Sequence, residues 1–242
     1  MKKRIVLSAK GIVALLISGV IQTASAQIYH ANDKNPVTDE GFSENGTLSG
    51  FPTNDAGTLA WVIQDTDTGN RAQYNVGSTP DPDYYRTNGW SLTWKLKIVD
   101  GPDTILDSTA RGIEMNWRYK NDGVNDRRYN IRFGLTNGNA TVFMLTGPAI
   151  TVPGAGVGFH KWTLERRPGT DVAGFYVDGT FLTNYSGFAD SSEARLYWGS
   201  ITAPSTGTSE WSLILLEVPE PSALGLLSLG ASGVFLLQRR RA

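Results

Sequence analysis

Hydrophobic and polar residues alternate along much of this chain. Between Trp90 and Ile98 every second residue is apolar, and the positions between them carry serine, threonine or lysine. The same alternation returns in residues 113–120 and 128–135. Because successive side chains of a β-strand point to opposite faces of a sheet, this period predicts half-buried strands of antiparallel sheet.

Further short strands are predicted along the rest of the chain, over residues 61–63, 73–76, 141–145, 161–166, 194–198 and 210–218. Phe175–Leu182 is typical of a hairpin, in which Asp178-Gly179 supplies the two positive-φ positions of a type I′ turn. About ten short strands, with turn signals roughly every 8–15 residues, predict an all-β fold, a two-sheet antiparallel jelly-roll sandwich. Residues 27–50 are polar and small, and we expect irregular chain there.

The N-terminal residues have the pattern of a secretory signal peptide. Four basic residues lie within positions 1–10, and an apolar core follows over residues 11–21. Ala24-Ser25-Ala26 then forms an A-x-A cleavage site before Gln27. The apolar core is too short for a transmembrane helix. We therefore predict a signal peptide over residues 1–26.

Residues 218–242 form a second segment of unusual composition. Val218-Pro219-Glu220-Pro221 precedes an apolar stretch over residues 223–237, and the basic residues Arg239, Arg240 and Arg241 follow. This order resembles the PEP-CTERM sorting signal of Gram-negative bacteria. The resemblance implies export to the cell envelope, outer surface or extracellular matrix, and processing by a membrane-embedded enzyme of the exosortase type.

The apolar stretch of this tail is a marginal membrane span. Its fifteen residues would make about 22 Å of helix, against a hydrocarbon core of about 30 Å. The three arginines would hold the C-terminus on the cytoplasmic side. The short span favours a hydrophobic helix that inserts transiently before processing, and the alternative is a permanent single-pass anchor.

Removing both ends changes the net charge of the protein. The complete sequence has 22 Lys and Arg residues and 23 Asp and Glu residues. Four basic residues lie in positions 1–26, and three basic residues and one acidic residue lie in positions 218–242. Residues 27–217 therefore carry a net charge of about −7, which disfavours nucleic acid and anionic membrane surfaces as partners. The absence of cysteine excludes thiol catalysis and cysteine-ligated metals.

Four motifs resemble the concanavalin A-like lectin/glucanase superfamily, in particular its laminin-G-like members. They are Trp162-Thr163-Leu164, Tyr176–Gly179, Trp198-Gly199-Ser200 and Trp211–Leu216. The resemblance implies a single β-sandwich over residues 27–217 and glycan binding on a concave sheet. The motifs mark turns and core aromatic residues and carry no chemistry of their own.

A carbohydrate-active enzyme, a glycoside hydrolase or lyase on the same fold, is the alternative function. Glucanases of this superfamily place E-x-D-x-x-E on one strand, and no such string occurs here. The best candidate strand carries Glu114 alone, with Asn116 where a second acid is needed, and Glu165 is expected to form a cross-strand ion pair. A Ser-His-Asp triad would have to use His30 or His160, but the sequence has no G-x-S-x-G motif to anchor it, and two distant histidines make a poor zinc site. We expect a noncatalytic protein.

The polar positions of the three clearest strands are the candidate binding residues for an extracellular polysaccharide with uronate or sulfate groups: Lys97, Glu114, Asn116, Arg118, Asn130 and Arg132. The alternative is a solvated sheet face with cross-strand ion pairs. The tryptophans are in phase with apolar neighbours and are predicted to lie in the core. Tyr84, Tyr85 and Tyr185 are the better candidates for exposed aromatic side chains.

Asp65 and Asp67 are the candidate metal ligands. The sequence Asp65-Thr66-Asp67 imitates the start of an EF-hand loop, but Val76 stands where the bidentate glutamate is needed. A Ca²⁺ site at these two residues is one interpretation, and a polar turn is the other. No other cofactor is expected.

Overall fold

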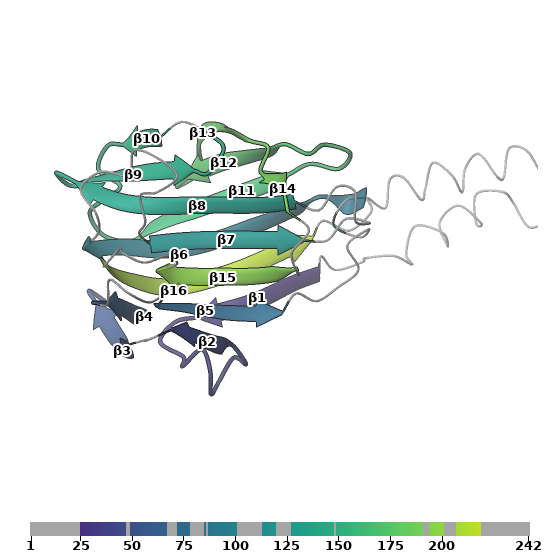
Figure 1. Cartoon of the computed structure of the whole chain (residues 1–242). Helices are drawn as coiled ribbons and strands as arrows, with labels where there is room; N and C mark the ends of the chain where they lie inside the picture. Colours follow the sequence, from purple (N-terminus) through teal and green to yellow (C-terminus); the bar gives the residue numbers. More distant parts are fainter. Residues whose placement is uncertain are drawn as a thin grey trace, which may run out of the picture. The chain divides into compact units, whose positions relative to one another are not determined.

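The computed structural model of the protein describes residues 25–46, 49–66, 72–77, 85, 87–100, 113–119, 127–147, 149–190, 194–200 and 207–218. These residues form sixteen strands in two antiparallel sheets that face each other as a sandwich (Figure 1). The predicted all-β, two-sheet fold is therefore confirmed. The predicted C-terminal hydrophobic helix lies outside the described residues, as do Ala24, Asp67, Tyr84 and residues 219–242.

Sheet A runs in the order β13-β12-β11-β6-β16-β4-β3, and β1 pairs with β16. Its strands are β1 (Ser25–Ala31), β3 (Ser49–Asp55), β4 (Thr58–Asp65), β6 (Trp90–Asp100), β11 (His160–Arg166), β12 (Ala173–Val177), β13 (Thr180–Tyr185) and β16 (Gly207–Val218).

Sheet B runs in the order β10-β9-β8-β7-β15-β5-β2, and β14 pairs with β8. It lies in front of sheet A in Figure 1. Its strands are β2 (Ser43–Gly46), β5 (Ala72–Gly77), β7 (Ile113–Tyr119), β8 (Arg127–Thr136), β9 (Asn139–Met144), β10 (Ala149–Val152), β14 (Phe188–Ala189) and β15 (Arg195–Ser200).

Aromatic side chains fill the space between the two sheets. Trp94 and Trp162 of sheet A stack on Phe175 with interplanar angles of 20° and 16°, and Phe133 of sheet B meets Trp162 edge-on at 4.9 Å. Truncating one such residue to alanine costs about 3–5 kcal/mol of stability. The predicted core position of the tryptophans is confirmed, since six of them are less than 2 % exposed: Trp90, Trp94, Trp117, Trp162, Trp198 and Trp211.

Two tight turns have the backbone conformation that their residues favour. Asp178 and Gly179 have φ values of 48° and 80° and connect β12 to β13, as predicted. Asn137 and Gly138 have φ values of 51° and 76° and connect β8 to β9. Positive φ at both central positions matches the right-handed twist of the strands, which is why Asp-Gly and Asn-Gly suit these turns.

The N-terminal segment departs from the expected irregular chain. Residues 27–50 contain most of β1, all of β2 and the start of β3. On β1, the fully buried ring of His30 contacts Glu40 Oε2 at 2.6 Å and the carbonyl oxygen of Trp211 at 3.0 Å. Backbone pairing, these polar contacts and the two buried rings of Tyr29 and Phe42 hold the segment, so it needs few hydrophobic residues and gives little sequence signal.

The prediction of exposed tyrosines is wrong for the two that the structure describes. Tyr85 is 1 % exposed and packs edge-on against Trp117 with ring centroids 5.8 Å apart. Tyr185 is 3 % exposed, and its hydroxyl donates to the carbonyl oxygen of Asn130 at 3.2 Å. Each ring completes the core at the edge of the sandwich, which requires contacts with residues distant in the sequence.

Candidate functional site

Five of the six predicted binding residues lie together on the outer face of sheet B, the face turned away from the core. Strands β7 and β8 are neighbours in this sheet. Their register places Glu114 opposite Arg132, Asn116 opposite Asn130, and Arg118 opposite Arg128. The alternation in the sequence therefore grouped these polar side chains correctly.

The sixth residue, Lys97, lies elsewhere, and its assignment to the same face is wrong. It belongs to β6 in sheet A, and the chain crosses to sheet B before β7 begins. Lys97 Nζ pairs with Asp55 Oδ2 at 2.8 Å and with Glu210 Oε1 at 3.1 Å. The hydrogen bond to Asp55 is the largest of several effects that raise the pKa of Lys97. Alternation shows which side of a strand a residue takes, but not the sheet to which the strand belongs.

Glu114 is a buried carboxylate at the centre of the polar face, with 1 % of its surface exposed. It accepts hydrogen bonds from Asn116 Nδ2 at 3.0 Å and from Asn130 Nδ2, and Arg132 Nε donates to it at 3.2 Å. Burial raises the pKa of Glu114, even though Arg132 and Arg128 oppose this effect. The network fixes both asparagine amides and the Arg132 guanidinium in place.

Three arginines form a row across the same face. Arg118 on β7 is the cross-strand neighbour of both Arg128 on β8 and Arg195 on β15. Asp190, directly after β14, lies 3.3 Å from Arg128 Nη1 and 3.7 Å from Arg118 Nε. Arg195 Nη1 donates to Asn75 Oδ1 at 3.0 Å. We call Arg128, Arg118 and Arg195 the arginine row.

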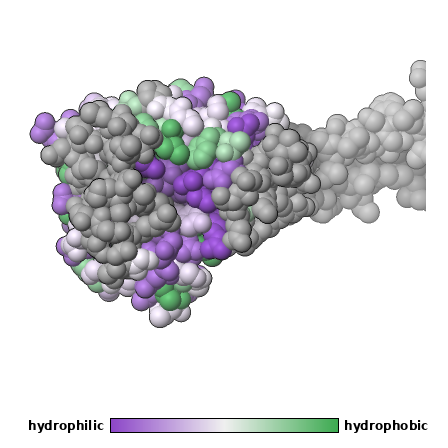
Figure 2. Space-filling view, in the orientation of Figure 1, coloured by the Kyte–Doolittle hydropathy of each residue, from purple (hydrophilic) through white to green (hydrophobic). Residues whose placement is uncertain are grey.

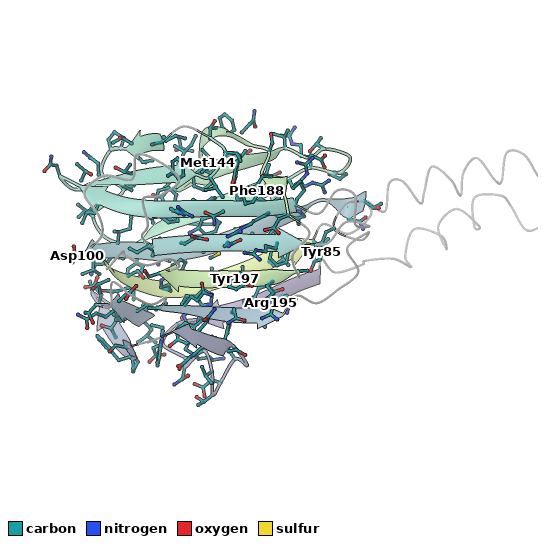
Figure 3. The ribbon with its side chains drawn as sticks, viewed as in Figure 1. Tyr85, Asp100, Met144, Phe188, Arg195 and Tyr197 are labelled. Atoms are coloured by element: carbon teal, nitrogen blue, oxygen red, sulfur yellow. The ribbon has the colours of Figure 1, made fainter. Side chains whose placement is uncertain are left out.

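Two aromatic rings accompany the arginine row. The guanidinium of Arg118 lies over the ring of Tyr197 at 4.9 Å, and that of Arg128 lies over the ring of Phe188 at 5.4 Å. Figure 3 labels both aromatic residues, together with Arg195, on the outer side of sheet B. In Figure 2 hydrophilic side chains gather in the middle of this face. Such contacts orient the planar guanidinium groups.

Sequence analysis missed Arg128, Arg195, Tyr197, Phe188 and Asp190. Tyr197 alternates with the core residues Leu196 and Trp198, so its outward position could have been derived from the sequence. Phe188 and Asp190 lie in or next to a strand of two residues, which leaves no periodic signal.

The predicted cross-strand ion pair of Glu165 is wrong. The cross-strand neighbours of Glu165 are Ser91 and Gly174, neither of which is basic. The next residue, Arg166, points into the protein, is 2 % exposed and donates from Nη1 to the carbonyl oxygen of Tyr85 at 3.0 Å. Adjacent residues of a strand face opposite sides, so Glu165 and Arg166 meet different environments.

The structure describes only one of the two residues considered for Ca²⁺. Asp65 lies at the end of β4 and is 2 % exposed, and Asp67 is outside the described residues. Within the described ranges no group of three or more His, Asp or Glu side chains could hold a metal ion. The calcium site stays a prediction.

Residues 217–241 match the PEP-CTERM protein-sorting motif. The chain is therefore an exported protein that is anchored or processed at the cell envelope. The structure describes only the first two matched residues, Glu217 and Val218, which end β16. Among the described residues no helix is long and apolar enough to cross a membrane. The assignment to Gram-negative bacteria stays a prediction.

Solved structures share the fold but little sequence. A carbohydrate esterase of the Shiga toxin-encoding bacteriophage phi24B matches with a TM-score of 0.60 and 13 % identity, over 82 % of this chain and 100 % of that chain. At such identity the likeness shows the fold alone.

Two further matches are weaker. A structure from a study of botulinum neurotoxin type C and its interaction with two ganglioside molecules has a TM-score of 0.45 and 10 % identity, over 85 % of this chain and 51 % of that chain. Trypanosoma rangeli sialidase has a TM-score of 0.44 and 14 % identity, over 72 % of this chain and 31 % of that chain. No functionally curated protein matches the sequence. The assignment to the concanavalin A-like superfamily stays a prediction.

Proposed function

We propose that this protein is a noncatalytic component of the cell envelope or extracellular matrix that binds glycan through the outer face of sheet B. The observation that carries the proposal is the combination, on one face, of partly exposed guanidinium groups with two partly exposed aromatic rings, next to a buried polar network that includes Asn116 and Asn130. Ligand sites typically combine a few precisely placed polar groups with apolar or aromatic surface.

The polar groups of this face are held before any ligand arrives. Glu114 fixes the amides of Asn116 and Asn130, and Asn116 Oδ1 accepts from Arg128 Nε at 3.2 Å. A preorganised site loses less conformational entropy on binding, which favours affinity. The rings of Tyr197 and Phe188 would offer apolar area against which a sugar ring can pack.

The arrangement of carboxylates supports a binding function over a catalytic one. Glu114 is committed to two asparagines and Arg132, and Asp190 pairs with Arg118 and Arg128. A glycosidase needs one carboxyl group that can exchange a proton with the substrate and a second as base or nucleophile. The enzymatic alternative predicts that a bound glycan is cleaved or loses a substituent.

Export supports the assignment to the envelope or matrix, and an exosortase-type enzyme is the proposed processing partner. Strand β16 ends at Val218, directly before Pro219, so cleavage within the motif would leave this central strand whole. Intact-mass analysis of the protein from its native host should give a chain without residues 1–26 and without the tail. Recovery of the uncleaved tail in the membrane fraction would support the permanent anchor instead.

A glycan array tests the binding site directly. The wild-type protein should bind a subset of glycans, and Tyr197→Ala should weaken this binding by about tenfold, which corresponds to about 1.4 kcal/mol. The matched control is Tyr176→Ala, which removes a partly exposed ring from the opposite sheet. The ring centroids of Tyr176 and Phe181 lie 5.5 Å apart there. Equal binding by wild type and Tyr197→Ala would contradict the site. Mass change of a bound glycan would establish the enzymatic alternative.

A further inference from the structure

We propose that the arginine row selects glycans that carry anionic groups, either carboxylates or sulfate esters. This inference rests on the proposed glycan-binding function and adds the chemical class of the ligand. The inference is based on the positions of these residues: Arg128, Arg118 and Arg195 occupy directly neighbouring positions on three adjacent strands.

The arrangement places like charges side by side. Neighbouring strands lie about 4.8 Å apart, so the row extends over about 10 Å of the sheet. Like charges directly opposite each other destabilise a sheet. A row of this kind is therefore unfavourable for folding unless an anion lies against it. Repeating anionic groups along a polysaccharide would meet that requirement.

Among the described residues, two carboxylates lie near Arg118 and Arg128. Asp190 is shared between these two arginines, and Glu114 lies 3.9 Å from Arg128 Nη2 and pairs more closely with Arg132. The Asp190 oxygen lies 3.7 Å from Arg118 Nε, which is too long for a hydrogen bond. This Nε is buried and has no hydrogen-bond acceptor within the described ranges. A carboxylate or sulfate of a ligand would instead meet the exposed part of the Arg118 side chain, which is 17 % exposed as a whole.

The electrostatics of Arg118 agree with this geometry. Burial lowers the pKa of Arg118, and the positive charge of Arg128 lowers it further. A bound anion would offset both effects, because an opposite charge nearby favours the protonated guanidinium. Arg118 would then gain a charge-assisted hydrogen bond, which is stronger than one between neutral groups.

A ligand can also reach the arginines more easily than it can reach the buried carboxylate of Glu114. The side chains of Arg118 and Arg128 are 17 % and 18 % exposed, whereas that of Glu114 is 1 % exposed. An incoming glycan therefore meets the guanidinium groups first. Arginine presents a planar fork of donors that matches carboxylate and sulfate oxygens, and the rings of Tyr197 and Phe188 hold two of these forks.

The test compares polymers that differ in charge. Binding of the full chain is measured to dextran sulfate, to dextran, and to polygalacturonate, so that sulfate and carboxylate are assayed separately. The wild type should bind at least one anionic polymer and should bind dextran weakly. Arg118→Gln should reduce the anionic binding by about tenfold while the thermal midpoint is maintained, because the change removes a like charge from the row.

The control variant is Arg167→Gln. Arg167 is exposed in the turn after β11, and its replacement changes the net charge of the protein by the same amount. It should bind as the wild type does. Equal losses for Arg118→Gln and Arg167→Gln would mean unspecific attraction of charge and would overturn the inference.

Two further results separate this inference from the proposed function. Equal binding of dextran and dextran sulfate, or array binding confined to neutral glycans, would overturn anion selection and leave glycan binding intact. Absence of binding to every glycan would overturn both. If Arg118→Gln fails to fold, the salt dependence of the wild type decides. Anionic binding should weaken between ~50 and ~500 mM salt as the Debye length shrinks, and binding that is independent of salt would refute the role of the row.

Discussion

The outer faces of the two sheets differ although their strands have the same alternating sequence. On sheet B, Glu114, Asn116 and Asn130 are at most 1 % exposed and bind one another. On sheet A, Lys161 and Glu165 occupy equivalent outward positions and are exposed to solvent. Alternation shows which residues point away from the core. It does not show whether the outward side meets water or further protein.

Burial changes what the charged residues contribute. An exposed ion pair contributes less than about 1 kcal/mol, because water screens it and its side chains lose entropy. In a buried pair, removal of one partner leaves a charge without solvent, which costs about 3–5 kcal/mol. The two faces should therefore respond differently to similar substitutions.

The largest effect is expected from Glu114→Ala. This change leaves the buried Arg132 and two asparagine amides without their common acceptor, so it should lower the free energy of unfolding by about 3–5 kcal/mol. Glu165→Ala, which removes an exposed carboxylate from the outer face of sheet A, should change it by less than about 0.5 kcal/mol. Urea denaturation measures both. Similar losses would show that the two faces do not differ in the way described.

A second effect is the dependence of stability on pH at the same position. The raised pKa of Glu114 means that the folded protein holds this proton more tightly than the unfolded chain. Protonated Glu114 therefore contributes fully to the stability of the folded protein below the ordinary glutamate pKa. This contribution decreases as the pH rises through the pKa that Glu114 has in the folded protein. Glu114→Gln cannot titrate there, so the wild type should lose stability relative to this variant as the pH rises. A difference independent of pH would contradict the assigned direction.

The smallest effect, with the opposite sign, is expected for Asp178 at the β12–β13 turn of sheet A. Partial burial raises its pKa, but hydrogen bonds from the His160 ring and the Lys161 amide outweigh that effect, so the pKa of Asp178 is lowered. Ionised Asp178 therefore contributes to the stability of the folded protein above the ordinary aspartate pKa. This contribution is lost as the pH falls through the lowered pKa of Asp178.

Asp178→Asn should therefore destabilise the protein slightly at neutral pH and have no effect in acid. Asparagine still suits the turn, so the turn itself should be maintained. Denaturation of both proteins across the acid range measures the difference. A destabilisation that grows toward low pH would be incompatible with this account.

The features that could be predicted from the sequence are those that depend on interactions within a short segment of the chain. The phase of the β6 strand from Trp90 to Ile98 and the Asp178-Gly179 turn depend on residues within one strand or one hairpin, so their pattern was sufficient. The sorting motif at residues 217–241 is likewise a contiguous signal. The grouping of Glu114 with Arg132 followed from the phase of two consecutive strands.

Only the tertiary structure decided the rest. Lys97 and Glu114 lie on different sheets because the chain crosses between layers after β6, and no local pattern marks such a crossing. The arginine row includes Arg195, which lies beside Arg118 because β15 pairs with β7. Positions 118 and 195 are some 77 residues apart in the sequence. Burial of Tyr185 and Glu114 depends on long-range packing. Strand phase is fixed by the pleat of one segment, whereas sheet membership and burial depend on which distant segments pair with it.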